Sequence, residues 1–374
     1  MQKFSFKRFL VLVLLLAAGT GMGLGLAYYL KKPSTGDTVP AEAGVTQPIT
    51  SEKTLALEVE SSFGNHLYPS LILSFGGVAS EFRKCITLRF SHAEVGEKCQ
   101  IKLASDLFET PYIKTLTLDS EDLVITPDVP WNFKRLRDVK QVRPETLVVS
   151  VVTSSGKRLQ TSCVVTVHPI NEVVSKLFDS ETGQWQDTSI CFAAYVNEGH
   201  PLINQIIQEA ALKTSVTRFS GYEFGLKSVK DQMQAVWETL AARGLNYSDL
   251  ATTSSEVSGV SSQYVRFVNE SLKDQGANCV DASLLFASIF RRIGLRPVLI
   301  FVPGHCFIGV YDKEQGGELI TLETTLLSSS TFAQAESAGD KEMQMASAMM
   351  GQTGFSYIDL SLARDSGVLP IESN

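Results

Sequence analysis

The chain has 374 residues, a formal net charge of −7 and 44% apolar residues, enough apolar content for two hydrophobic cores. Its Lys and Arg residues are scattered rather than concentrated, which excludes a basic phosphate-binding face and hence a nucleic-acid partner. Six cysteines are too few for a disulfide framework of this length, and none forms a Cys-x-x-Cys zinc pair. We therefore expect two folded domains, no nucleic acid and no bound metal.

An uncharged, largely aliphatic run extends from Phe9 to Leu30. As a helix of about 22 residues it would span roughly 33 Å, which matches a hydrocarbon core of about 30 Å. Basic residues flank it on both sides, so residues 1–32 are predicted to form a single membrane anchor. The N-terminus would be cytoplasmic and the body periplasmic or at the cell surface. A cleaved signal peptide is the alternative, because Phe9–Ala18 has the length of a signal-peptide core.

Residues 33–50 are rich in Pro, Thr, Ala and Gly and are predicted to form a flexible linker. Residues 51–175 contain short runs with two-residue alternation, which predict an all-β sandwich-like domain. The expected strands are Tyr68–Phe75, Cys85–Phe90, Cys99–Leu103, Thr115–Leu118, Leu147–Val152 and Cys163–Val167. Ser154–Gly156 suits a hairpin between the last two. We interpret the histidines of this region (His66, His92 and His168) as structural.

Residues 185–374 change to longer, helix-period segments, so we expect an α+β domain. One helix is predicted over 201–213, with Pro201 at its first position. A second should begin at a capping box of Ser228 and Asp231 and end at Gly244. The polar stretch 247–263 is predicted to be a loop that borders a cleft. A Met-rich helix is expected over 332–350, and we interpret its apolar face as a packing surface.

The most informative segment begins at Asn278, which is placed to cap a helix that ends at Gly294. Cys279 then lies in the first turn, where backbone amides and the helix dipole favour a thiolate, the nucleophilic form of cysteine. Asp281, two residues later, opposes this effect.

Two β-like runs follow, 297–302 and 306–311, with Pro303 and Gly304 between them, so His305 is expected at a strand start. A third run, 319–322, ends at Glu323. A helix-start thiol, a strand-start imidazole and a carboxylate therefore come in the order that acyl transfer by a Cys, His, acid set requires.

At these residues the chain resembles the transglutaminase-like superfamily, which is papain-like in catalytic layout. The matching pieces are Cys279 at the helix start, Arg292-x-Gly294-Leu295-x-Pro297, Gly304-His305 with Phe307, and Leu322-Glu323-Thr324-Thr325. The resemblance implies that Cys279 is the nucleophile, His305 the general base and acid, and Glu323 the group that orients the imidazole. The family usually has Asp-Pro-Thr where this chain has Glu-Thr-Thr. For the oxyanion, the Cys279 amide is the first donor, and Gln275 or Asn278 the second.

The expected fold is therefore α+β: an N-terminal membrane helix, an all-β sandwich-like domain, and a transglutaminase-like (papain-like) α+β domain. The expected function is a membrane-tethered, cysteine-dependent acyl-transfer enzyme, whether peptidase, amidase or transglutaminase-like. It would act without a cofactor on a peptide, protein or cell-wall substrate. The alternative is a non-catalytic transglutaminase-like binding module of the cell envelope, which a disulfide between Cys279 and Cys306 would favour.

Overall fold

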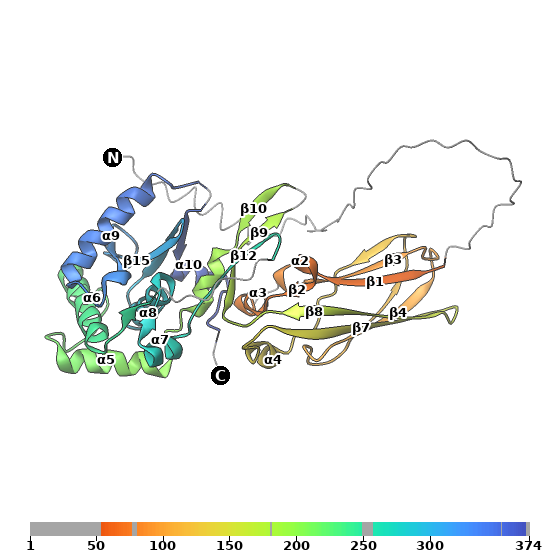
Figure 1. The fold of residues 1–374 in the computed structure, drawn as a ribbon, viewed down its shortest axis with the longest axis horizontal. Coiled ribbons are helices and arrows are strands. Elements are labelled where there is room, and N and C mark those ends of the chain that lie inside the picture. The colour runs from red at the N-terminus through yellow and green to blue at the C-terminus, as the bar shows by residue number, and fades with distance from the viewer. Residues whose placement is uncertain (1–53, 77–80, 180–181, 249–256, 353, 372–374) are drawn as a thin grey trace, which may run out of the picture.

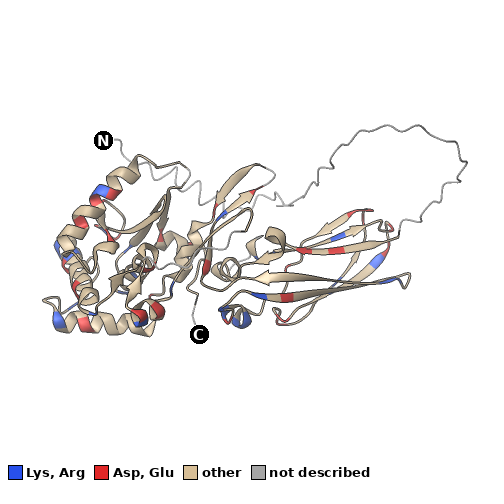
Figure 2. Cartoon of the chain, in the orientation of Figure 1, with Lys and Arg blue, Asp and Glu red and all other residues tan. Residues whose placement is uncertain are grey.

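We describe a computed structural model of the chain, covering residues 54–76, 81–179, 182–248, 257–352 and 354–371. The chain forms two lobes that lie end to end (Figure 1). The N-terminal lobe comprises residues 54–171, and the C-terminal lobe begins with strand β9 (Glu172–Asp179). Lys and Arg residues are interspersed with Asp and Glu residues along both lobes (Figure 2).

Two sheets build the N-terminal lobe. The first has the order β1-β3-β6 and the second β2-β8-β7-β4-β5, with antiparallel pairing throughout except between β2 and β8. The strands are β1 (Ala56–Ser61), β2 (His66–Leu67), β3 (Ile86–Ser91), β4 (Lys98–Ala104), β5 (Tyr112–Thr117), β6 (Leu123–Ile125), β7 (Arg143–Thr153) and β8 (Arg158–Val167). Burial alternates strictly along β3, as expected of a strand with one face in a core.

Five of the six strands predicted for this lobe are confirmed as β3, β4, β5, β7 and β8, and the turn at Ser154–Gly156 joins β7 to β8. The sixth prediction is wrong, because Pro69–Ser74 forms helix α3. All its residues are buried, and a buried run of six residues is too short for its pattern to separate a helix from a strand. Pro69 stands at the first helical position, where its missing N–H costs nothing.

The predicted fold class is wrong. The described residues form a mixed α/β structure, and the N-terminal lobe is not all-β, since it also contains α2 (Ser62–Asn65), α3, the 3-10 turn η1 (Glu81–Arg83) and α4 (Phe133–Arg137). Among the described residues, no helix is long and apolar enough to cross a membrane. The segment Phe9–Leu30 lies outside those residues.

The C-terminal lobe is built on an antiparallel sheet with the order β16-β15-β14-β17. Its strands are β14 (Pro297–Val302), β15 (His305–Tyr311), β16 (Leu319–Leu322) and β17 (Ser356–Asp359). A second antiparallel sheet joins β9 to β10 (Gln184–Asp187) and β12 (Val260–Tyr264), and a parallel pair joins β11 (Asn246–Tyr247) to β13 (Gly276–Ala277).

Six helices pack on the four-stranded sheet and on one another in the described part of this lobe. They are α5 (Pro201–Lys213), α6 (Gly225–Ala242), α7 (Val268–Asp274), α8 (Cys279–Arg292), α9 (Phe332–Ser347) and α10 (Leu360–Asp365), with 3-10 turns η2 (Ser189–Tyr195) and η3 (Thr324–Leu326). Helix α8 is buried from Val280 to Phe290 and lies at the centre of the lobe, whereas α5, α6 and α9 lie on its outside (Figure 1). The core that contains α8 includes Leu299 and Ile308, and a smaller cluster packs Ala346 of α9 against Val298 and Ile300.

The helix predictions for this lobe were accurate in position but less so at helix ends. Helix α5 has the predicted bounds, and α9 ends at Ser347. The capping box at Ser228 is wrong, because α6 already begins at Gly225, and its N-cap, Phe224, makes no side-chain cap. The loop predicted over 247–263 is wrong at both ends, where β11 and β12 pair with other strands.

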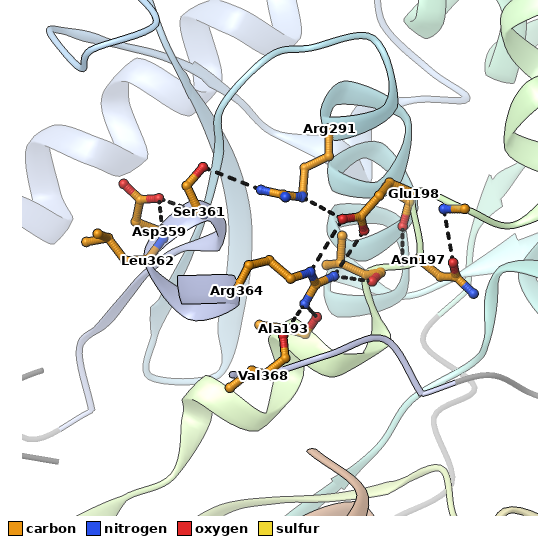
Figure 3. A network of polar contacts seen from close by, with 12 residues as sticks. Ala193, Asn197, Glu198, Arg291, Asp359, Ser361, Leu362, Arg364 and Val368 are labelled. Carbon is orange, nitrogen blue, oxygen red and sulfur yellow. Dashed lines mark hydrogen bonds and ion pairs between the residues drawn. The ribbon is translucent and has the colours of Figure 1, made fainter. Parts of the chain in front are cut away.

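An arginine cluster fixes the C-terminal end of α8 (Figure 3). Glu198 accepts hydrogen bonds from Arg291 of α8 at 3.1 Å and from Nη2 of Arg364 of α10 at 3.0 Å. Arg364 also donates to the carbonyls of Ala193 and Val368. Since these groups come from separate elements, the cluster ties α8, α10 and η2 together.

Hydrogen-bonded polar side chains join the two lobes. His66 Nδ1 lies 2.8 Å from His168 Nε2, and His168 Nδ1 lies 2.8 Å from Glu172 Oε2. Ser262 of β12 donates to the other Glu172 oxygen at 2.6 Å. Burial lowers the pKa of His66, and the neighbouring His168 lowers it further.

Candidate active site

The N-terminus of α8 holds the candidate nucleophile. Asn278 caps the helix as predicted: its Oδ1 accepts from the Asp281 amide at 2.8 Å, and Asp281 Oδ2 accepts from the Asn278 amide at 3.2 Å. Cys279 is therefore the first helical residue. Its side chain is partly buried and lies where the first-turn amides and the positive end of the helix dipole act on the sulfur.

Arg266 balances the carboxylate of Asp281. Its backbone amide donates to Asp281 Oδ1 at 2.8 Å, and its guanidinium donates to Oδ2 at 2.9 Å. Burial raises the pKa of Asp281, and these hydrogen bonds oppose that rise. The negative charge that counted against a Cys279 thiolate in the sequence is thus paired with a cation, which the sequence pattern did not reveal.

His305 lies at the start of β15, after a turn in which Gly304 has a φ of +76°. Its Nε2 lies 2.7 Å from Glu323 Oε2, and its side chain remains 26% exposed. Hydrogen bonds with the side chains of Cys279 and Glu323 raise the pKa of His305 to about 10, although burial opposes them. Because this pKa lies well above 7, His305 carries a proton at neutral pH. Since Nε2 is engaged by Glu323, Nδ1 is the ring nitrogen left to face the sulfur.

Glu323 follows β16 and caps the 3-10 turn η3. Its Oε1 accepts from the Thr325 amide at 3.0 Å and from the Thr325 hydroxyl at 2.6 Å, which leaves Oε2 for His305. Burial raises the pKa of Glu323, but the hydrogen bonds from His305 and Thr325 outweigh it, so the net pKa lies below its ordinary value. The carboxylate is thus held ionised and in one orientation.

These contacts bring all three predicted residues together from three separate elements. Helix α8 supplies Cys279, β15 supplies His305, and the end of β16 supplies Glu323. Ser283 strengthens this junction, since its hydroxyl donates to the Cys279 carbonyl at 2.7 Å and lies 3.3 Å from the Thr324 hydroxyl. The arrangement has a thiol at a helix start, an imidazole with a raised pKa and a carboxylate with a lowered pKa, which are the groups that a cysteine acyl-transfer site requires.

One of the two residues considered as second oxyanion donors is engaged elsewhere, because Gln275 Nε2 donates to the Arg243 carbonyl at 2.8 Å. The helix cap uses the side-chain oxygen of Asn278, which accepts from the Asp281 amide, and does not occupy its Nδ2 group. The Cys279 amide, at the helix start, therefore stays the first expected donor, and Asn278 Nδ2 the second.

Tyr247 is a neighbour of the site that the sequence reasoning missed. It pairs with Ala277 in the parallel ladder that leads into Cys279, and its side chain is 43% exposed. Strand β11, which carries it, also contacts η3 behind Glu323. The sequence offered no signal for this placement, because each strand of the parallel pair has only two residues and the two strands lie about 30 residues apart in the chain.

All six cysteines are free thiols in the structure. Cys306 is fully buried next to His305 in the chain, and burial raises its pKa well above the ordinary value. In the part of the chain that the structure describes, no group of three or more His, Cys, Asp or Glu residues is placed to hold a metal ion.

A scan of the sequence against protein-family models gives no match, and a search of curated proteins finds no relative. The likeness to the transglutaminase-like superfamily therefore rests on the motifs around Cys279, His305 and Glu323, and stays a prediction.

Proposed function

We propose that this protein is a cysteine-dependent acyl-transfer enzyme of transglutaminase-like type that acts on peptide or protein amides. The observation that carries the proposal is the contact chain from Cys279 through His305 to Glu323, in which His305 has its pKa raised to about 10. A protonated imidazole beside a helix-start sulfur supplies both the charge partner of a thiolate and the proton for a leaving amine.

The reaction would proceed in two steps. The Cys279 thiolate attacks the amide carbonyl, the oxyanion is stabilised by the Cys279 amide, and His305 gives its proton to the departing amine, which leaves a thioester. Water or a second amine then loses a proton to His305 and attacks the thioester, and the thiolate departs. Water gives hydrolysis and an amine gives cross-linking.

The substrate site would face the exposed edge of the His305 ring. A body outside the cytoplasm, tethered through Phe9–Leu30, stays a prediction from the sequence, as does a peptide, protein or cell-wall substrate.

Iodoacetamide labelling tests the reactivity of Cys279 against an internal reference. Cys163 is also a partly exposed free thiol, and its pKa is raised by burial and by Glu60. At pH 6, peptide mass spectrometry should find Cys279 alkylated at least ten times faster than Cys163. Equal rates would remove the basis of the proposal.

A second experiment separates the two outcomes of the thioester. The protein is incubated with a peptide mixture and a fluorescent primary amine, in wild-type form and as Cys279→Ala. New peptide N-termini indicate hydrolysis, and fluorescent peptides indicate amine transfer. Neither product, together with a labelled but inert Cys279, would favour the non-catalytic binding module instead.

A further inference from the structure

A cavity of about 450 Å³ lies at the opposite end of β15 from His305. Its lining residues include Arg296, Tyr311, Leu319, Met343, Met350 and Leu362. Six residue steps along β15, at about 3.3 Å each, place Tyr311 roughly 20 Å from His305. The cavity is therefore separate from the candidate active site, and its volume falls in the range of small-molecule sites, about 300–1,000 Å³.

The polar end of the cavity is formed by Arg296. Its Nε and Nη2 donate to the two oxygens of Asp359, at 3.3 and 2.6 Å, so the charges of the two side chains cancel. The guanidinium lies over the Tyr311 ring, 4.9 Å from its centre. The hydrogen bonds from the Arg296 guanidinium to Asp359 use Nε and Nη2, and Arg296 lines the cavity, so Nη1 is the nitrogen left for a ligand. Gly316 lies beside this nitrogen, since a Cβ there would stand 4.0 Å from Nη1.

The rest of the wall is apolar and adaptable. Met343 of α9 and Met350, just beyond its end, line the cavity together with Leu319 and Leu362. Methionine side chains adjust to ligands of differing shape, which suits a binding wall. Met343 also packs against the cluster around Val298 and Ile300, as the predicted packing surface requires, so the Met-rich helix contributes to both the core and the cavity.

We propose that this cavity binds a small neutral molecule with an apolar body and a hydrogen-bond acceptor, such as a primary amide. The acceptor takes the Nη1 protons of Arg296, and the body lies between the methionines. A neutral head is favoured over a carboxylate because Asp359 already balances Arg296 and the exposed Glu318 lies at the rim. An ammonium head has only donors, so it cannot accept the Nη1 protons of Arg296 and would pair with Glu318 at the rim instead.

Methionine methyl NMR with a matched series of ligands tests the proposal on the full chain. The probes are hexanamide, hexanoate and hexylammonium, which share one apolar body. Hexanamide should shift the methyl signals of Met343 and Met350, with half-saturation at a concentration about tenfold lower than for hexylammonium. Met345, 59% exposed on the same helix, and the buried Met233 are internal controls whose signals should not move.

Variants complete the test without breaking the buried ion pair. Leu362→Trp fills the cavity and should abolish the hexanamide shifts, whereas Leu369→Trp, at a 49% exposed position outside the lining, should leave them unchanged. Equal shifts at Met345, no shifts at Met343 and Met350, equal affinity for hexylammonium, or full binding by Leu362→Trp would each overturn the proposal. None of these readouts depends on Cys279, so they are independent of the proposed enzymatic activity.

Discussion

Replacement of Glu323 by Gln is the sharpest test of how the site is held. Gln keeps the length of the side chain and an oxygen that can accept from Thr325, so the start of η3 is preserved. It removes the negative charge 2.7 Å from His305 Nε2. The variant therefore probes the charge of the orienting group while the backbone around it stays in place.

The expected size of the effect follows from the contact. A hydrogen bond to a charged group contributes about 1.5–3 kcal/mol, and about 1.4 kcal/mol corresponds to one pH unit. Glu323→Gln should therefore lower the pKa of His305 by roughly one to two pH units from its value of about 10. It should not return to 6.5, because the hydrogen bond with Cys279, the largest single cause that raises the pKa of His305, stays in place.

Imidazole NMR across pH 5–11 measures this change directly, and the rate of Cys279 alkylation gives a second profile. Because the pKa of His305 is raised, the protonated form and the stability it contributes are fully present below about 6.5 and are lost as pH rises through about 10. In the variant, this loss should begin one to two pH units earlier. The alkylation profile of Cys279 should change over the same range, between about pH 8 and 10.

Glu323→Asp is the matched companion, since it keeps the charge but shortens the side chain by one methylene. If reach matters, the 2.7 Å contact is lost and the pKa of His305 falls as it does with Gln. Glu314→Gln, at an exposed position between β15 and β16, is the control and should change nothing. Wild-type titration curves for both Glu323 variants would refute the assignment of Glu323 as the orienting group.

Three further predictions concern the frame around the site. Arg364→Met removes one of the hydrogen-bond partners of Glu198 and the bond to the Ala193 carbonyl. The free energy of unfolding, measured in urea, should fall by about 2–3 kcal/mol, and a fall of less than about 0.5 kcal/mol would contradict this prediction. Gly339→Ala places a Cβ 2.6 Å from the Leu322 amide, so α9 must move off β16. Stability should fall by about 1–3 kcal/mol, and Cys279 alkylation should slow. His66 has a lowered pKa, so its contribution to stability is present above about 6.5 and lost as pH falls. The free energy of unfolding, measured in urea, should therefore rise between about pH 5 and 7, and His66→Gln should reduce that rise. An equal dependence on pH in both proteins would be evidence against this prediction.

Local chemistry made much of the site predictable. Asn278 and Asp281 specify the helix start within four residues, and Gly294, with a φ of +83°, specifies its end. Pro303 and Gly304 mark the turn that puts His305 at the head of β15. Each of these signals acts within one element or one turn, which is the range over which a single sequence is informative.

Contacts between elements were not predictable in the same way. Arg266 reaches Asp281 from a segment 15 residues away, and the lobe junction depends on Ser262 meeting Glu172 from 90 residues away. The strand predicted at α3 was wrong because a buried run of six residues is too short for its pattern to separate a helix from a strand. In each case, contacts between elements determined the structure, and the local sequence pattern does not report such contacts.

The departure from the usual Asp-Pro-Thr pattern has a geometric explanation in the sheet register. Ile308 pairs with Leu322, so the next residue, Glu323, lies across from Phe307 and diagonal to His305. Diagonal neighbours on adjacent strands are about 7–8 Å apart between backbones, a span that favours a longer side chain. The extra methylene of Glu323 lets one oxygen reach His305 while the other stays on Thr325. The register therefore predicts that the length of Glu323 matters, and the Glu323→Asp variant tests this prediction.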